Sequence, residues 1–73
     1  MPEIKIFTEV SGRVCEVRVA AGGRVNQDDD VVMVEAMKME IPASSPAAGT
    51  IKSILVRLDD LVAEGQAVAV LDT

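Results

Sequence analysis

The 73-residue chain lacks histidine, tryptophan and tyrosine, and it has a single cysteine and a single phenylalanine. One cysteine cannot close a disulfide within the chain, and a structural zinc site has too few ligands without histidine. A cysteine nucleophile would also lack the histidine that commonly activates it. We therefore expect neither catalytic residues nor a metal site, and a core made of aliphatic side chains and methionine.

Positive charge is also scarce, because seven Lys and Arg residues stand against twelve Asp and Glu residues, for a formal net charge of −5. The basic residues are scattered, so the basic patch that binds nucleic acid is missing. No apolar run approaches the length of a membrane span, and the N-terminus lacks the layout of a signal peptide. We expect no nucleic-acid partner, no membrane insertion, and a location in the cytoplasm or another reducing aqueous compartment.

The sequence contains an internal repeat of strand-forming segments. Its β-branched residues are gathered in short runs, and no segment keeps a helical period, which favours strands. A shift of 37 residues aligns the two halves without a gap. Aligned residues, called equivalent below, include Gly12 with Gly49, Val31 with Val68, and Val34 with Leu71. The pattern predicts one domain, residues 1–73, whose pseudo-two-fold halves are about residues 1–36 and 37–73.

Seven or eight short strands are expected, in a small all-β sandwich or flattened barrel. We predict strands at residues 3–8, 12–19, 31–35, 39–41 and 67–71, and another that begins at Gly49. Gly22-Gly23 and the equivalent Asp59-Asp60 are predicted turns. Pro42 and Pro46 are expected to bracket a Ser/Ala-rich connection.

The second strand of each half has irregular apolar spacing. Val14, Val17 and Val19 lie three and then two positions apart, and the equivalent residues 51, 54 and 56 repeat this spacing. A step of three breaks strand alternation, so we predict a β-bulge just after the glycine in both halves.

Cys15 falls within this irregular step. The equivalent residue is Lys52, which suggests access to water, whereas strand parity with Val17 suggests burial. Both alternatives stay open, and we assign the thiol no catalytic role.

Asp28, Asp29 and Asp30 form a run of carboxylates in the predicted loop 26–30. Such a run could bind a metal ion, but no further ligand spacing supports a site, so a solvated loop is favoured. Asp28 is equivalent to Gly65, and aspartate tolerates a left-handed conformation better than most residues. A left-handed turn is therefore expected at both positions.

Glu35-Ala36-Met37-Lys38-Met39 follows the apolar run 31–34 and precedes a second strand. Hairpin turns normally use Gly, Asn or Asp, which tolerate positive φ. The run instead places a lysine between two methionines, which favours presentation of the amine. The alternative is that Met37 and Met39 fill the core while Lys38 merely points to solvent.

All five residues of this run match the Glu-Ala-Met-Lys-Met pattern of the biotinyl/lipoyl attachment family, and the chain resembles its biotin carboxyl carrier type over nearly its whole length. The resemblance implies two four-stranded antiparallel sheets related by a pseudo-two-fold axis. It places the modified lysine on a hairpin at one end and the chain termini at the other, and the gap-free repeat implies no inserted thumb. Asp28 to Asp30, where many relatives have glycine, and Ser45-Pro46, where they often have Ala-Pro, depart from the pattern.

The resemblance further implies that a biotin protein ligase attaches biotin to Lys38, with Glu35, Ala36, Met37 and Met39 serving recognition and presentation. The tethered biotin would carry a carboxyl group between a biotin carboxylase and a carboxyltransferase, as in acetyl-CoA carboxylase, while the chain itself would be non-catalytic. Two alternatives remain: an unmodified interaction domain, and a lipoyl carrier, whose usual Asp-Lys-Ala is not matched here.

Overall fold

The computed structural model describes residues 2–73. Within that range the chain forms eight β-strands and no helix, so no segment there could cross a membrane as a helix. The strands are β1 (Glu3–Phe7), β2 (Gly12–Val17), β3 (Arg24–Val25), β4 (Asp30–Ala36), β5 (Met39–Ser44), β6 (Gly49–Ile54), β7 (Leu61–Val62) and β8 (Ala67–Asp72). The all-β prediction is confirmed.

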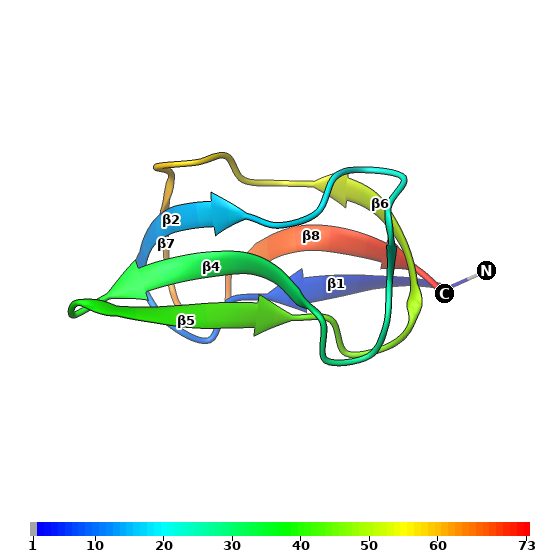
Figure 1. Cartoon of the computed structure of the whole chain (residues 1–73), viewed down its shortest axis with the longest axis horizontal. Coiled ribbons are helices and arrows are strands. Elements are labelled where there is room, and N and C mark those ends of the chain that lie inside the picture. The colour runs from blue at the N-terminus through cyan, green and yellow to red at the C-terminus, as the bar shows by residue number, and fades with distance from the viewer. Residues whose placement is uncertain (1) are drawn as a thin grey trace.

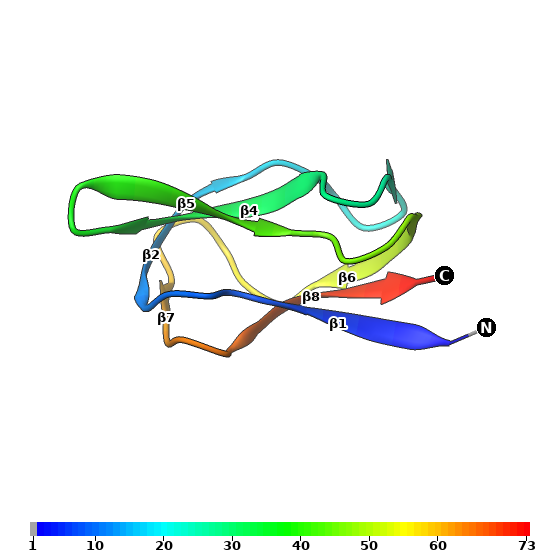
Figure 2. The same cartoon turned by 90° about the horizontal axis from the view of Figure 1, so that it is seen from below.

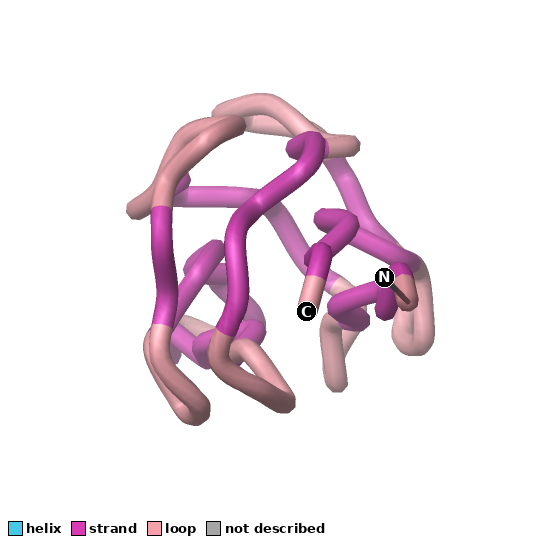
Figure 3. Tube along the Cα trace, turned by 90° about the vertical axis from the view of Figure 1, so that its right-hand side faces the viewer, coloured by secondary structure: helices cyan, strands magenta, loops and turns pink. Residues whose placement is uncertain are grey.

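The strands form two four-stranded antiparallel sheets, in the orders β1-β8-β6-β3 and β5-β4-β2-β7. They pack as two layers, seen edge-on in Figure 2. From the end that carries the termini, strands are seen on two sides of the interior (Figure 3). The β2–β3 and β6–β7 connections, residues 18–23 and 55–60, are equally long, so no thumb is inserted. The predicted flattened sandwich is confirmed.

Aliphatic side chains from both halves fill the space between the sheets. The completely or almost completely buried residues include three equivalent pairs: Val14 with Ile51, Val31 with Val68, and Val34 with Leu71. Burial of one such side chain contributes roughly 1.5–3 kcal/mol. Truncation of Leu71 to Ala would therefore leave a cavity and cost about 2–5 kcal/mol. No disulfide contributes, because Cys15 is unpaired.

The two predicted bulges are present at equivalent positions. The β2–β4 register shifts between Val14 and Glu16, and the β6–β8 register shifts between Ile51 and Ser53. Cys15 is therefore the extra residue of the first bulge, so the parity argument for its burial does not apply. The thiol is half-buried, and its Sγ lies 3.5 Å from the Met33 carbonyl oxygen.

The left-handed turns predicted at Asp28 and Gly65 are confirmed, and the turns predicted at residues 22–23 and 59–60 also contain an equivalent left-handed pair. Asp28 has φ 73° and Gly65 has φ 81°, while Gly22 has φ 90° and Asp59 has φ 73°. The backbone N–H of Asp28 donates to the Ser45 carbonyl at 2.8 Å, just as that of Gly65 donates to the Thr8 carbonyl at 2.9 Å. The 37-residue alignment thus extends to backbone conformation and hydrogen bonding, as the predicted pseudo-symmetry requires.

Several strand ends differ from the prediction. The first two strands end earlier, at Phe7 and Val17 rather than residues 8 and 19, while the last continues one residue further to Asp72. The fourth strand is longer at both ends, since it includes residues 30 and 36.

The largest error concerns the strand after the motif, which ends at Ser44 and not at residue 41. Pro42 lies within it, opposite Met33, and does not begin a connection. Proline is tolerated there because β5 is an edge strand, where a residue without an N–H can face away from the sheet.

The carboxylates of the acidic run act separately. Asp29 Oδ2 accepts a hydrogen bond from the Asn26 backbone N–H at 2.8 Å, and Asp30 Oδ1 accepts one from the Ser44 hydroxyl at 3.3 Å. Among residues 2–73, no group of three or more His, Cys, Asp or Glu side chains is arranged to hold a metal ion.

Candidate functional site

The β4–β5 hairpin carries the five-residue motif at the end of the molecule opposite the termini. In Figure 1 the hairpin extends at the left, and the N and C labels lie at the right. Ala36 and Met39 form the last cross-strand pair, so the turn itself consists of only Met37 and Lys38. The apolar run before the motif anchors it, since Val32 and Val34 of β4 are completely buried.

Both turn residues have positive φ, 52° at Met37 and 66° at Lys38. Two successive left-handed residues are the pattern of a type I′ turn, whose twist matches that of the flanking strands. Residues with a Cβ pay roughly 1–2 kcal/mol each for this conformation. The hairpin therefore holds Met and Lys in a turn for which Asn-Gly is the favoured sequence, and strain of this kind is commonly retained at functional sites.

The side chains of the turn project into solvent. Met37 is 95% exposed and Met39 is 63% exposed, so the alternative that both methionines fill the core is wrong. Lys38 is also exposed. Among the described residues, none of the salt bridges includes its ammonium group. The tip thus presents a primary amine between two thioethers.

At the base of the hairpin, four side chains form a row across the outer face of one sheet. Glu40 pairs with Glu35, Glu35 with Arg13, and Arg13 with Leu61. Two carboxylates directly opposite each other repel, but Arg13 Nη2 lies 3.3 Å from Glu35 Oε1. The same guanidinium also forms an ion pair with Asp59. Arg13 therefore joins the motif to the left-handed turn at Asp59.

The electrostatic effect of this arrangement is local. Hydrogen bonds to Glu35 and then Asp59 raise the pKa of the Arg13 guanidinium, which stays charged throughout the ordinary pH range. All three side chains are substantially exposed, so solvent screens the ion pairs and their contribution to stability is small. Their main effect is to orient the Glu35 carboxylate beside the hairpin.

Gly12 allows β2 to approach the hairpin base closely. A Cβ at this position would collide with the backbone carbonyl oxygen of Glu35, and a Cβ at the equivalent Gly49 would collide with that of Asp72. The two contacts are equivalent, since residues 35 and 72 also differ by 37. Glycine is needed here for space and not for positive φ.

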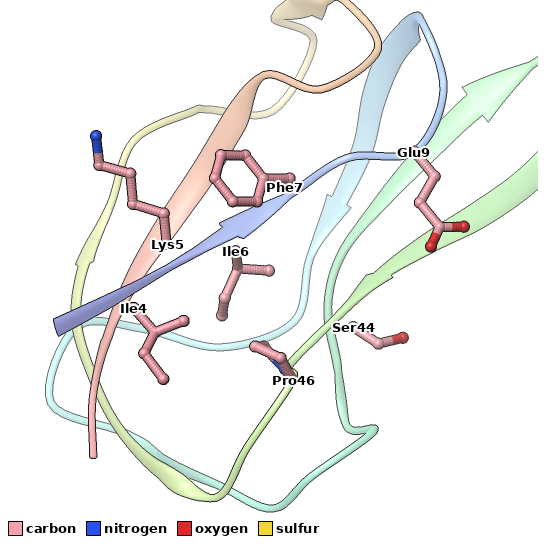
Figure 4. Close-up of a pocket in the computed structure, with 7 residues that line it drawn as sticks. All are labelled: Ile4, Lys5, Ile6, Phe7, Glu9, Ser44 and Pro46. Atoms are coloured by element: carbon pink, nitrogen blue, oxygen red, sulfur yellow. The ribbon is translucent and has the colours of Figure 1, made fainter. Parts of the chain in front are cut away.

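The structure contains a shallow pocket of about 390 Å³ between the edge strands β1 and β5. Figure 4 shows Ile4 and Ile6 on one side of β1, facing Pro46, with Phe7 on the other side of the strand. Lys5, Glu9 and Ser44 complete its lining. None of the five motif residues contributes to it, so the pocket and the hairpin tip are separate features.

The thiol of Cys15 lacks a histidine that could activate it, because the sequence contains none. Burial raises its pKa, and the negative charge of Glu40 raises it further. Both effects favour the protonated, unreactive form. The nucleophile that the site offers is therefore the Lys38 amine, which could form an amide with an activated carboxylic acid delivered by another protein.

The sequence predicted Glu35, Ala36, Met37, Lys38 and Met39 as one group, and the structure brings them together at the hairpin. Arg13 was missed, because its sequence position lies far from the motif and only the strand register places it opposite Glu35. The exposed Leu61 was missed for the same reason. The only signal in the sequence was the excess of acidic residues, twelve against seven basic ones, which does not identify the partners of Arg13.

Comparisons with known proteins agree with this geometry. The family model Biotin_lipoyl, described as "Biotin-requiring enzyme", matches residues 1–71. The chain is 35% identical to the "Biotinylated protein TB7.3 homolog" of Mycobacterium leprae over 66 residues, which are 90% of this chain and 93% of that protein.

Two larger proteins contain a similar segment. The chain is 39% identical over 72 residues to a "Dihydrolipoyllysine-residue acetyltransferase component of pyruvate dehydrogenase complex" of Cupriavidus necator, covering 99% of this chain but 13% of that protein. The crystal structure of Kluyveromyces lactis urea carboxylase superposes with a TM-score of 0.93 at 30% identity, covering 99% of this chain and 6% of that one. The chain thus spans a small part of these two relatives.

Proposed function

Because the chain belongs to the family of biotin/lipoyl attachment domains, we propose that it is a biotin carboxyl carrier whose biotin is attached covalently to Lys38. One observation carries this proposal: an exposed lysine without a salt-bridge partner among the described residues occupies a strained two-residue turn between two exposed methionines. A two-residue turn with only a structural role would favour the sequence Asn-Gly. The Met-Lys sequence is explained if the amine must be presented.

Two observations support biotin over lipoate. The similarity to the mycobacterial "Biotinylated protein" covers nearly the full length of both chains, whereas the acetyltransferase component is matched over a small part of its length. In addition, Met37 and Met39 both flank the lysine, as in the biotin attachment pattern described above. The identity with the acetyltransferase component, 39%, keeps a lipoyl carrier as the second candidate.

The residues of this chain have a simple role in the attachment reaction. A biotin protein ligase would supply biotinyl-adenylate, and the Lys38 Nζ would attack its acyl carbon. The C–N bond of the amide forms as the bond to AMP breaks, AMP leaves with the electron pair, and the amine releases a proton to a base or to water. The exposed turn lets the amine reach into the ligase without unfolding of the domain.

Once attached, biotin would supply a ureido nitrogen that takes up a carboxyl group from bicarbonate, with ATP, at a biotin carboxylase and gives that group up to an acceptor substrate at a carboxyltransferase. The domain contributes the tether, which raises the effective concentration of the reactant at each partner. Met37 and Met39 would contact the partner enzymes, since flexible thioethers adapt to several surfaces. We place this cycle in the cytoplasm.

The test is an intact-mass measurement of the chain co-expressed with a biotin protein ligase. We expect the addition of one biotinyl group to the wild type and none to Lys38→Arg, whose guanidinium stays protonated and is a poor nucleophile. Lys5→Arg is the matched control, because Lys5 is also exposed but lies on β1. A lipoyl mass would favour the second candidate, and a bare mass would contradict both.

A second measurement tests the carrier role. The biotinylated domain, supplied with a biotin carboxylase, ATP and radioactive bicarbonate, should acquire label, whereas the domain alone should not. Met37→Ala and Met39→Ala should slow labelling while the free energy of unfolding changes little, because both side chains are exposed. Normal labelling of both variants would refute the contact role of the methionines.

A further inference from the structure

The pseudo-symmetry of the fold allows each half to serve as a reference for the other. Segment 55–61 carries three exposed leucines, Leu55, Leu58 and Leu61, which are 51%, 59% and 80% exposed. Their equivalents in the first half are Arg18, Ala21 and Arg24, which are exposed as well. At these three positions, exposed leucine is therefore specific to the second half.

The backbone of the two segments is nevertheless the same. The Leu55 N–H donates to the Val68 carbonyl at 2.8 Å, and the Arg18 N–H donates to the Val31 carbonyl at 2.9 Å. The Asp60 N–H donates to the Arg57 carbonyl at 3.1 Å, and its equivalent, Gly23, donates to Ala20 at 3.0 Å. The first half adopts this backbone with arginine or alanine at the three equivalent positions. Folding therefore does not require leucine at residues 55, 58 and 61.

Leu61 lies close to the lysine hairpin in space. It pairs with Arg13, which pairs with Glu35, three residues before Lys38. Adjacent strands are about 4.8 Å apart and residues about 3.3 Å apart along a strand. Leu61 is therefore displaced from Lys38 by two strand spacings across the sheet and by three residues along the strand. These two displacements separate the residues by roughly 14 Å. A standard interface covers about 800 Å² per partner, so one partner can contact both residues.

The surroundings of Leu61 specify the chemistry of that partner. Arg13 lies directly beside Leu61 on the neighbouring strand, Glu35 and Glu40 lie two and three strands across in the same row, and Asp59 and Asp60 precede Leu61 in the chain. Arg13 is already paired with two of these carboxylates. The surface is thus an apolar centre with an acidic rim, which is complementary to an apolar recess bordered by Lys and Arg side chains.

We infer that Leu58 and Leu61, together with the acidic rim, form the docking surface for the ligase that modifies Lys38, which bears a matching apolar recess with a basic border. The inference rests on the proposed function. The ligase is favoured over the later partners because the lysine amine itself must enter its active site, which brings the body of the domain against the enzyme. The later partners receive the far end of the biotin arm, so their contact with the domain can be more distant.

The experiment measures kcat/KM for biotin transfer by a ligase that modifies the wild-type domain. Leu61→Arg and Leu58→Ala install the residues of the equivalent positions, which are compatible with this backbone. We expect Leu61→Arg to lower kcat/KM at least about tenfold, through KM, and Leu58→Ala to lower it about fivefold. The matched control is Leu55→Arg, whose backbone is bonded to β8 in the other sheet, and it should stay within about twofold of the wild type.

Thermal melts of each variant accompany the kinetics, and Leu61→Ala replaces Leu61→Arg if the latter is unfolded. Wild-type rates for Leu61→Arg, or equal losses for Leu61→Arg and Leu55→Arg, would overturn the inference. A third result would also overturn it: sedimentation shows that the wild type is a dimer, and Leu61→Arg dissociates the dimer without changing kcat/KM. The surface would then bind a second copy of this chain and not the ligase. A wild-type domain that no biotin ligase modifies would refute the proposed function itself, and the docking surface with it.

Discussion

Replacement of Met37 by Asn is expected to stabilise the domain while impairing its modification. Met37 and Lys38 have φ of 52° and 66°, so each occupies the left-handed region. Asn populates that region far more readily than Met and is preferred at the first central position of a type I′ turn. Met37 is 95% exposed, so the substitution removes almost no buried apolar area. The change in stability should therefore report backbone strain alone.

The magnitude follows from the cost of the left-handed conformation, roughly 1–2 kcal/mol for a residue with a Cβ. If Asn removes about half of this cost at residue 37, the free energy of unfolding rises by about 0.5–1 kcal/mol. For a domain of this size, that corresponds to an increase in Tm of about 2–8 °C. Met37→Gly should gain less, because glycine adds chain entropy to the unfolded state.

Urea and thermal denaturation of the wild type, Met37→Asn and Met39→Asn measure this effect. Met39 begins β5 and does not have positive φ, so Asn there relieves no strain and should be neutral or destabilising. In parallel, biotin transfer to Lys38 should slow in Met37→Asn, since the thioether proposed to contact the ligase is gone. Unchanged or reduced stability of Met37→Asn would refute the argument that this turn is strained.

Three further predictions test other parts of the fold. Gly65→Asp should lower the free energy of unfolding by about 1 kcal/mol, because residue 65 has a left-handed φ of 81°, whereas Asp28→Gly should be neutral or stabilising. Urea titration measures both variants, and a loss of stability in Asp28→Gly would mean that the two turns differ in energy. Gly12→Ala should cost about 1–3 kcal/mol or prevent folding, since its Cβ would meet the Glu35 carbonyl, and a melt like that of the wild type would contradict this close approach. Alkylation of Cys15 at pH 8 should be slower in the folded than in the urea-unfolded chain, because burial raises the pKa of the thiol, and equal rates would show that the folded chain leaves the thiolate accessible.

The parts of the structure that repeat in the sequence were the parts that could be predicted. The bulges at residues 15 and 52 and the left-handed turns at Asp28 and Gly65 followed from a gap-free alignment of the halves, because the same backbone imposes the same spacing twice. Strand ends were less accurate. Pro42 was taken as the start of a connection, since a sequence does not reveal that β5 lies at the edge of its sheet.

The candidate site likewise has one part that could be predicted from the sequence and one part that could not. The motif is contiguous in the chain, so its five residues could be grouped without a structure. The row from Glu35 through Arg13 to Leu61 depends on the register of three strands, which no local pattern specifies. The solvent exposure of Met37 and Met39 could not be predicted from the sequence either. Both were compatible with core or surface positions, and only the structure shows that one lies in the turn and the other beside it, both in solvent.

The position of the termini has a mechanical consequence. The Thr73 N–H donates to the Pro2 carbonyl at 3.2 Å, at the end of the molecule opposite the hairpin (Figure 1). The body between them is 36 Å long and consists of two hydrogen-bonded sheets. A flexible linker joined to either terminus would therefore act as a pivot, with the domain as a rigid lever and Lys38 at its moving tip. Rotation about this pivot would carry the lysine along an arc whose radius is set by the length of the domain, without deformation of the fold.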